Sequence, residues 1–419
     1  MKKRRRGGAL PKGGRAGRTP AGVGTAEAGG CARKGGAQHR SCASYGGPLP
    51  QDGGPQRKKG GFTMTAREKI LPLLEEKGAD CALFLDEVSI RWLTRFAASD
   101  GAAVVDRTGV RLLVDPRYYA AAKDAKAAGR LFDDVCPEPF SGGLLAALAS
   151  LSGRRVLLDS ARVTVRTAER LRGPVGGGEL LFCDDVCGPA RRVKDAFELD
   201  CIRRAQAVTD AAFAHILGFL RPGLTETQVA AELEYFCRRS GADGMAFETI
   251  AVSGNKSAYP HGVPGDVPLS ANAFLTMDFG ARVDGYCSDM TRTVVLGRAT
   301  PEMKRIYDTV LTAQEKAIAA VRGGVPCSAV DAAARTHIDA CGYAGLFGHS
   351  TGHSLGLEIH ERPAFSAACA DPAAPGTVMT VEPGVYVEGL GGVRIEDMVL
   401  VTETGCENLT RSPKQLIEL

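Results

Sequence analysis

The stretch FLTMDFGARVDGYCSDMTRTVVL, residues 274–296, has two apolar segments rich in β-branched residues on either side of the dipeptide Asp-Gly at 284–285. This dipeptide favours a tight turn, so the stretch predicts a β-hairpin. With a two-residue loop, Asp278 lies opposite Thr291, and Asp289 is its diagonal neighbour on the same face, because side chains alternate along a strand. The hairpin therefore directs two carboxylates into one space.

Two carboxylates as close as Asp278 and Asp289 raise each other's pKa, so the arrangement is stable only with a proton or a cation between them. A divalent cation is the natural candidate. An isolated pair of acids in a hairpin is more often an ordinary pair of solvated strand residues. The choice between these two interpretations depends on sequence further along the chain.

Four histidines occur in two further motifs, His261 in YPHG and the other three, His349, His353 and His360, in FGHSTGHSLGLEIHERP. The spacing of His349 and His353 is that of a helical metal pair. However, the glycines between them favour loop and strand, and the HExxH signature of zincins is absent. Three histidines in 12 glycine-rich positions favour a functional site over buried structural histidines.

The segment VMTVEPGVYVEGLGGVRIEDMVLV, residues 378–401, predicts a second hairpin. Glu382 and Glu396 stand 14 positions apart across a Gly-Gly turn, so they lie opposite each other only with an odd-length loop or a bulge. Pro383 lacks a donor for the strand ladder, which makes a bulge beside it plausible. Again two carboxylates can share one face.

Together the two hairpins and one histidine offer four carboxylates and one imidazole: Asp278, Asp289, His353, Glu382 and Glu396. Hard oxygen ligands in this excess favour Mn²⁺, although Co²⁺ or Zn²⁺ would also bind. Two divalent cations balance the charge of four carboxylates. The sequence therefore predicts two divalent metal ions.

Four segments together resemble the pita-bread metallopeptidases, the superfamily of aminopeptidase P, prolidase and methionine aminopeptidase: FETIAVSGNKSAYPHGVPGD, MDFGARVDGYCSDMTRT, TGHSLGLEIHERP and VEPGVYVEGLGGVRIED. The resemblance runs from about Val193 to the C-terminus. The preceding region is similar to the N-terminal domain of creatinase, aminopeptidase P and prolidase, which methionine aminopeptidase lacks. Ser354 stands where family members commonly have glycine, a change that leaves every ligand position in place.

The resemblance implies a role for each candidate residue. It makes Asp278 a residue that chelates or bridges the metal ions, and it makes Asp289 and Glu396 shared ligands. His353 and Glu382 complete the ligands of one metal ion. It places His261, His349 and His360 around the substrate carbonyl and leaving nitrogen, and it makes Arg394, with Tyr386 as its partner, a support for the ligands. A hydroxide between the metal ions would attack the peptide carbonyl, with Glu382 moving the proton and His360 hydrogen-bonding to the tetrahedral intermediate.

The expected function is removal of an N-terminal residue that precedes proline, as in aminopeptidase P, from peptides with proline at the second position. The alternative is prolidase, which is restricted to Xaa-Pro dipeptides. A creatinase-type amidinohydrolase shares the fold but lacks this ligand set. A non-catalytic binding protein arises on this fold when ligands are lost, and here all five are present. Family members are commonly homodimers or higher homo-oligomers.

Three parts are expected within the 419 residues, because single hydrophobic cores stop growing near ~250 to 300 residues. Residues 1–63 hold 14 Lys/Arg, 2 Asp/Glu and 17 of the 52 glycines, which predicts a disordered basic extension. Residues 64–190, where helix and strand patterns alternate, predict an α/β domain, which the resemblance implies is creatinase-like. The resemblance implies that residues 191–419 form an α+β pita-bread catalytic domain.

The basic extension leaves several interpretations open: an arm for nucleic acid, an organelle transit peptide, or a segment without a structural role that precedes a start at Met64. We favour the last, and so expect no nucleic-acid partner. No apolar stretch approaches the ~18 residues of a membrane span, so no membrane partner is expected. The 13 cysteines are scattered without a zinc-site spacing, and reduced thiols in a cytoplasmic protein are the simplest explanation.

Overall fold

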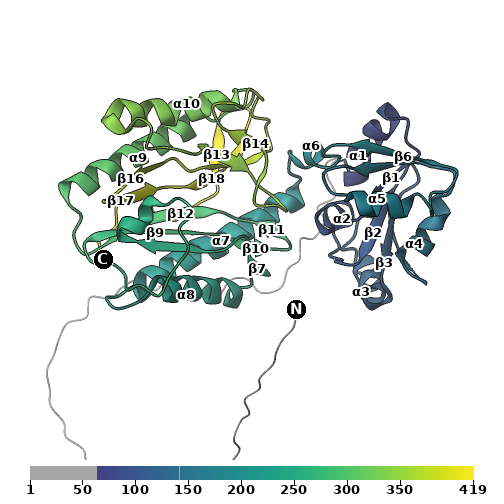
Figure 1. Cartoon of the computed structure of the whole chain (residues 1–419), viewed down its shortest axis with the longest axis horizontal. Helices are drawn as coiled ribbons and strands as arrows, with labels where there is room; N and C mark the ends of the chain where they lie inside the picture. Colours follow the sequence, from purple (N-terminus) through teal and green to yellow (C-terminus); the bar gives the residue numbers. More distant parts are fainter. Residues whose placement is uncertain (1–63, 141) are drawn as a thin grey trace, which may run out of the picture. The chain divides into compact units, whose positions relative to one another are not determined.

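A mixed sheet of six strands forms the first part of the structure, a computed structural model that describes residues 64–140 and 142–419 (Figure 1). The expectations for residues 1–63 lie outside the described residues. In spatial order the strands are β4 (Val135–Pro139), β3 (Val110–Val114), β2 (Gly101–Val105), β1 (Cys81–Phe84), β5 (Arg155–Asp159) and β6 (Glu179–Cys183). The antiparallel pairs are β1/β2 and β2/β3, and the other neighbours are parallel.

Helices flank this sheet: α1 (Ala66–Glu76), α2 (Glu87–Thr94), α3 (Pro116–Ala127), α4 (Leu144–Ala147) and α5 (Val165–Leu171). Strands β1 and β2 are buried along their whole length, as expected for central strands with both faces covered. The short helix α6 (Gly188–Arg191) leads from this part to the long helices that follow.

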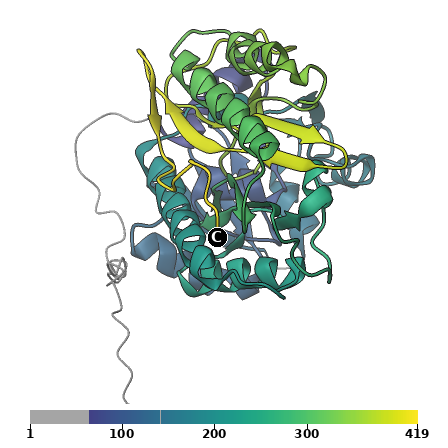
Figure 2. The same ribbon diagram turned by 90° about the vertical axis from the view of Figure 1, so that its left-hand side faces the viewer.

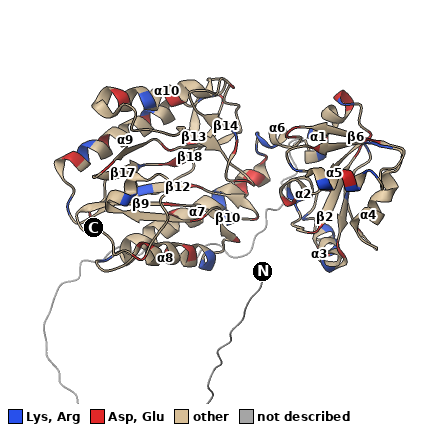
Figure 3. Ribbon diagram, viewed as in Figure 1, with Lys and Arg blue, Asp and Glu red and all other residues tan. Residues whose placement is uncertain are grey.

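Four long helices frame the second part: α7 (Ala196–Phe219), α8 (Glu226–Arg239), α9 (Pro301–Ala320) and α10 (Cys327–Ile338). Capping boxes begin the first two, with Asp195 and Glu198 at α7 and Thr225 and Gln228 at α8. Figures 1 and 2 show α7 and α8 on one side of the strands and α9 and α10 on the other. Charged residues of both signs occur along these helices (Figure 3).

The strands between these helices form four small sheets. The first sheet has the order β12 (Met290–Leu296), β9 (Ala273–Phe279), β8 (Ile250–Ser253). The second has the order β11 (Tyr286–Cys287), β10 (Ala281–Val283), β7 (Gly244–Met245). The third is β14 (Glu361–Phe365), β13 (Gly352–Ser354), β15 (Val378–Val381), β18 (Asp397–Val401), β19 (Cys406–Asn408). The fourth pairs β16 (Gly384–Val387) with β17 (Gly391–Arg394).

The first hairpin has the predicted register, with Asp278 opposite Thr291. Both turn residues have positive φ, 49° at Asp284 and 83° at Gly285, as a two-residue type I′ turn requires. The ribbon is interrupted between β9 and β10, where a Cβ on Gly280 would lie 1.9 Å from the Ser288 carbonyl oxygen. Glycine is therefore needed at this close approach of the two strands.

The second hairpin also confirms its prediction. The pairs Val381↔Asp397 and Gly384↔Arg394 belong to one register, which sets Glu382 opposite Glu396. An odd-length loop of three residues, 388–390, closes the ribbon, so of the two predicted causes of the alignment the loop applies and the bulge does not. No helix in the described part of the chain is long and apolar enough to span a membrane.

A buried arginine fastens the two ribbons to the C-terminal segment. Arg292, on β12, pairs with Asp397 on β18 at 2.7 Å, and it donates to the carbonyl oxygens of Ser412 at 2.8 Å and Pro413 at 2.9 Å. Both members of the ion pair are buried, with side-chain exposures of 1% and 2%. Removing the guanidinium group would leave two buried carbonyl oxygens without this donor and the Asp397 carboxylate without part of its charge compensation.

We therefore expect Arg292→Met to lower the free energy of unfolding by about 3 to 5 kcal/mol. The matched control is Arg298→Met, because the Arg298 side chain is 89% exposed and its change should cost less than about 0.5 kcal/mol. Urea unfolding followed by circular dichroism measures both. Equal unfolding midpoints for the two variants would show that the buried pair does not stabilise the fold.

Candidate metal centre

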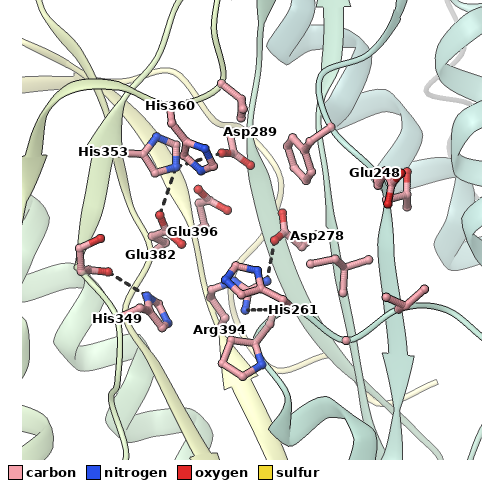
Figure 4. A pocket seen from close by; sticks show the side chains of 18 of the residues that line it. Glu248, His261, Asp278, Asp289, His349, His353, His360, Glu382, Arg394 and Glu396 are labelled. Atoms are coloured by element: carbon pink, nitrogen blue, oxygen red, sulfur yellow. Dashed lines mark hydrogen bonds and ion pairs between the residues drawn. The ribbon is translucent and has the colours of Figure 1, made fainter. Parts of the chain in front are cut away.

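Two hairpins and one further strand bring the predicted ligands to one cavity (Figure 4). Asp278 lies on β9 and Asp289 immediately precedes β12, so both come from the first hairpin. Glu382 follows β15 and Glu396 precedes β18, so both come from the second. His353, from β13, completes the group. The structure therefore gathers all five residues that the sequence selects.

Distances within the group are those of a cation site. The ligand atoms of Asp289, His353 and Glu396 all lie within 4.8 Å of one another. His353 Nε2 lies 3.5 Å from Asp289 Oδ2 and 3.4 Å from Glu382 Oε1. The carbonyl oxygen of Ser354, 3.1 Å away, accepts from His353 Nδ1, which leaves the Nε2 lone pair directed at the carboxylates.

Two of the carboxylates each have one anchored oxygen and one free oxygen. Asp278 Oδ2 accepts from Arg394 Nη2 at 2.6 Å, and Glu396 Oε2 accepts from Thr291 Oγ1 at 2.8 Å. Their other oxygens, Asp278 Oδ1 and Glu396 Oε1, are buried and have no hydrogen-bond partner among the described residues. Buried oxygens without partners cost free energy, so this donor set fits divalent cations.

The pKa values of the cluster lead to the same conclusion. Burial, together with neighbouring carboxylates, raises the pKa of Asp289 and of Glu396 well above the usual values. Burial raises the pKa of Glu382 to about 7, against the opposing charge of Arg394. Burial lowers the pKa of His353, which favours its neutral form. Without cations the raised pKa values favour protonated carboxyl groups, and bound cations would replace those protons.

Arg394 organises one side of the centre. Its guanidinium also donates to Tyr386 Oη at 2.9 Å and to Thr291 Oγ1 at 2.9 Å. Tyr386 Oη is in turn 2.8 Å from His349 Nε2. Burial and the charge of Arg394 lower the pKa of His349 to about 4, so this imidazole is neutral. The predicted pairing of Arg394 with Tyr386 is present, and it extends to His349.

The cavity above the cluster has a volume of about 510 Å³, which lies within the range of small-molecule sites. Its remaining polar wall contains all three histidines predicted to surround the substrate, His261, His349 and His360. Its apolar wall consists of Phe247, Ile250, Val263, Pro264 and Ile359. The site therefore combines a polar floor with apolar sides.

Thr291 and Thr380 are the residues that sequence reasoning did not select. Thr291 holds Glu396 and Arg394, and its position opposite Asp278 in the predicted register was a sufficient signal. Thr380 Oγ1 accepts from the His353 amide at 3.0 Å and donates to Glu382 Oε1 at 3.2 Å. No local pattern marks Thr380, because it meets His353 only when β13 and β15 pack side by side.

A carboxylate-rich cluster below a cavity of this size fits a metal-dependent hydrolase. The models of two families match the chain: "Metallopeptidase family M24" over residues 200–403, and "Creatinase/Prolidase N-terminal domain" over residues 67–193. The chain belongs to metallopeptidase family M24. It is a peptidase with an N-terminal creatinase-type α/β domain and an α+β catalytic domain of the pita-bread fold, as predicted.

Three similar proteins span the same two regions. The Xaa-Pro dipeptidase of Pyrococcus furiosus is 32% identical over 84% of this chain and 99% of its own length. The structure of an Xaa-Pro dipeptidase from Bacillus anthracis is 34% identical, with a TM-score of 0.80 over 84% of this chain and 99% of that one. The X-Pro aminopeptidase of Thermotoga maritima is 34% identical, with a TM-score of 0.77 over 82% of this chain and 99% of that one.

A pH-dependent stabilisation by metal follows from the raised pKa of Glu382. Between the ordinary pKa of about 4.5 and about 7, the folded metal-free protein binds more protons than the unfolded chain, so its stability falls as pH rises. We expect the melting temperature of chelator-treated protein to fall from pH 5 to pH 7.5. At a free Mn²⁺ concentration 100-fold above the Kd at pH 7.5, each bound ion should add about 2.7 kcal/mol at that pH.

The increase in melting temperature on adding Mn²⁺ should be larger at pH 7.5 than at pH 5, because protons compete with the cation at low pH. In Glu382→Gln the metal-free melting temperature should depend less on pH. Thermal unfolding followed by fluorescence provides the measurement. Equal increases at the two pH values would contradict this account of the cluster.

Proposed function

We propose that this protein hydrolyses the peptide bond between an N-terminal residue and a proline at the second position, and that Xaa-Pro dipeptides are its substrates. The observation that carries the proposal is the convergence of four carboxylates and one imidazole beneath the cavity. The dipeptidases among the similar proteins support the dipeptide preference. The aminopeptidase activity expected from the sequence becomes the second candidate, which the Thermotoga maritima enzyme supports.

We propose that two divalent ions, with Mn²⁺ favoured over Co²⁺ or Zn²⁺, are held by Asp278, Asp289, His353, Glu382 and Glu396. When bound, such ions lower the pKa of water from about 15.7 towards ~7 and polarise the substrate carbonyl. The charge of the donor set supports the number of ions, because four carboxylates balance two divalent cations. The predominance of oxygen donors supports the choice of Mn²⁺.

The remaining groups would bind and orient the peptide. Glu382, whose pKa lies near 7 in the metal-free protein, is suited to take a proton from the attacking water and deliver it to the proline nitrogen as the peptide bond breaks. His360 and His261 would donate hydrogen bonds to the carbonyl oxygen as negative charge develops on it. His349, neutral and fixed by Tyr386, would contact the substrate from the opposite wall.

We also propose a cytoplasmic location, because every cysteine in the described part of the chain is free. The expected homodimer or higher oligomer, the domain boundaries at residues 63 and 190, and the expected absence of nucleic-acid and membrane partners all stay predictions.

The metal ligands are tested by Asp289→Ala. Loss of a buried shared ligand should remove bound metal and lower kcat/KM on Ala-Pro by more than the ~100-fold that loss of a supporting group causes. The control is Asp308→Ala, on the exposed face of α9, which should retain both metal and activity. Metal content by atomic emission, measured beside the kinetics, reports the cause. Wild-type activity in metal-free Asp289→Ala protein would refute the assignment.

Substrate length separates the two candidate functions. With Mn²⁺ present, we expect the protein to hydrolyse Ala-Pro and to leave Ala-Pro-Ala and Ala-Ala essentially uncleaved, because a dipeptidase must recognise the free carboxylate of proline. Chromatographic product analysis over a series of Xaa-Pro peptides of graded length gives kcat/KM for each. Comparable values for Ala-Pro and Ala-Pro-Ala would assign the protein to the aminopeptidases.

A further inference from the structure

His360 reaches the cavity on residues 356–361, which comprise most of the connection after β13 and the first residue of β14. Its imidazole lies edge-on to that of His353, with ring centroids 4.5 Å apart (Figure 4). Among the described residues, no hydrogen bond fixes the His360 imidazole. The place of this ring in the cavity therefore depends on how firmly the backbone of the segment is held.

Two glutamates of the same segment point away from the cavity into a cluster of cations. Glu361, which follows His360 directly, pairs with Arg191 and, through Oε2, with Lys194 Nζ at 2.9 Å. Glu358, two residues before His360, has its Oε2 3.0 Å from Arg191 Nη1. Arg191 thus bridges carboxylates on both sides of the histidine.

The two basic residues, Arg191 and Lys194, lie in the chain segment that connects the two parts of the fold. Arg191 ends α6 and Lys194 precedes α7, where Lys194 Nζ also donates to the Arg191 carbonyl oxygen at 2.9 Å. Their side chains are only 4% and 1% exposed. Although burial raises the pKa of Glu361, the charges of Lys194 and Arg191 lower it to about 2, so this carboxylate is ionised.

Backbone contacts make the segment rigid as well. The carbonyl oxygen of Gly356 accepts from the Cys287 amide at 2.8 Å, and the Glu358 amide donates to Glu361 Oε1 at 3.3 Å. A Cβ on Gly356 would lie 2.7 Å from Glu361 Oε1, so the carboxylate packs directly on the backbone. A shift of the Glu361 carboxylate would therefore move the segment that carries His360.

We propose that Arg191 and Lys194 are positioning residues, which hold His360 at the substrate through Glu361 and Glu358. The inference rests on the proposed peptidase function, in which His360 hydrogen-bonds to the substrate carbonyl. A displacement of about 1 Å at a reacting group lowers turnover by as much as ~100-fold. The residues before α7 thus influence catalysis through the position of His360 and do not touch the substrate.

The first test is Arg191→Met, which keeps the apolar length of the side chain. Lys194 still pairs with Glu361, and Arg162 still pairs with Glu358 at 2.6 Å, so neither carboxylate loses all compensation. We expect kcat on Ala-Pro to fall by about 10- to 100-fold with unchanged metal content and KM within about 2-fold. The matched control is Arg192→Met, because the neighbouring Arg192 pairs with Asp371 and should leave kcat unchanged.

A double-variant cycle with His360→Ala identifies the route of the effect. If Arg191 acts through His360, Arg191→Met should cause no further loss of kcat in the His360→Ala background. Multiplication of the two losses would show that Arg191 acts elsewhere and would overturn the proposal. A normal kcat for Arg191→Met would overturn it too. If Arg191→Met fails to fold, Arg191→Lys replaces it, since one ammonium group cannot bridge both carboxylates in the same way.

Hydrogen–deuterium exchange of chelator-treated protein gives a test that does not depend on activity. Amides of residues 356–361 should exchange at least about 10-fold faster in Arg191→Met than in wild type, and at the wild-type rate in Arg192→Met. Unchanged exchange in Arg191→Met would refute the positioning role. Inactivity of the wild-type protein on every Xaa-Pro peptide would instead refute the proposed function, while the exchange experiment would still decide the positioning role.

Discussion

The constraint on which this structure depends is the charge of four carboxylates buried within one small volume. Such a group is stable only when each oxygen meets a donor, a proton or a cation. Arg394 anchors Asp278 and Thr291 anchors Glu396, each through one oxygen only. The anchored oxygens fix the orientation of each carboxylate, and the remaining oxygens converge. The same arrangement that strains the metal-free protein prepares the site to bind cations.

Interrupted ribbons explain how strand residues can converge in this way. A regular hairpin would display its side chains on two flat faces. Here the first ribbon breaks at Gly280, beside Asp289, and the second breaks at Pro383, beside Glu382. At these breaks the strands change sheets, so the carboxylates turn towards one cavity. The two hairpins thus reach the same result by the same geometric device.

Buried ion pairs hold the loops that bring histidines to the cavity. Glu226 accepts from the amides of Ser253 and Gly265, at 2.8 and 3.0 Å, on either side of the loop with His261. Arg335 donates to the carbonyl oxygen of His349 at 2.8 Å. The pairs are Glu226 with Lys256, Asp331 with Arg335, and Glu361 with Arg191 and Lys194. The backbone beside each histidine is thereby held in place, while the imidazole of His349 is fixed in addition by Tyr386.

The sequence by itself determined both hairpin registers, the capping of α7 and α8, and the five residues that converge beneath the cavity. These features are local, because the alternation of side chains and the chemistry of turns and caps act over a few residues. The sequence did not determine which oxygen of each carboxylate is anchored, nor that Tyr386 joins Arg394 to His349. Only the tertiary structure decided these contacts, and it alone revealed that Lys194 and Arg191 meet Glu361 across 167 and 170 positions of the chain. Contacts at that range arise from packing of separate elements, and no periodicity in the sequence encodes them.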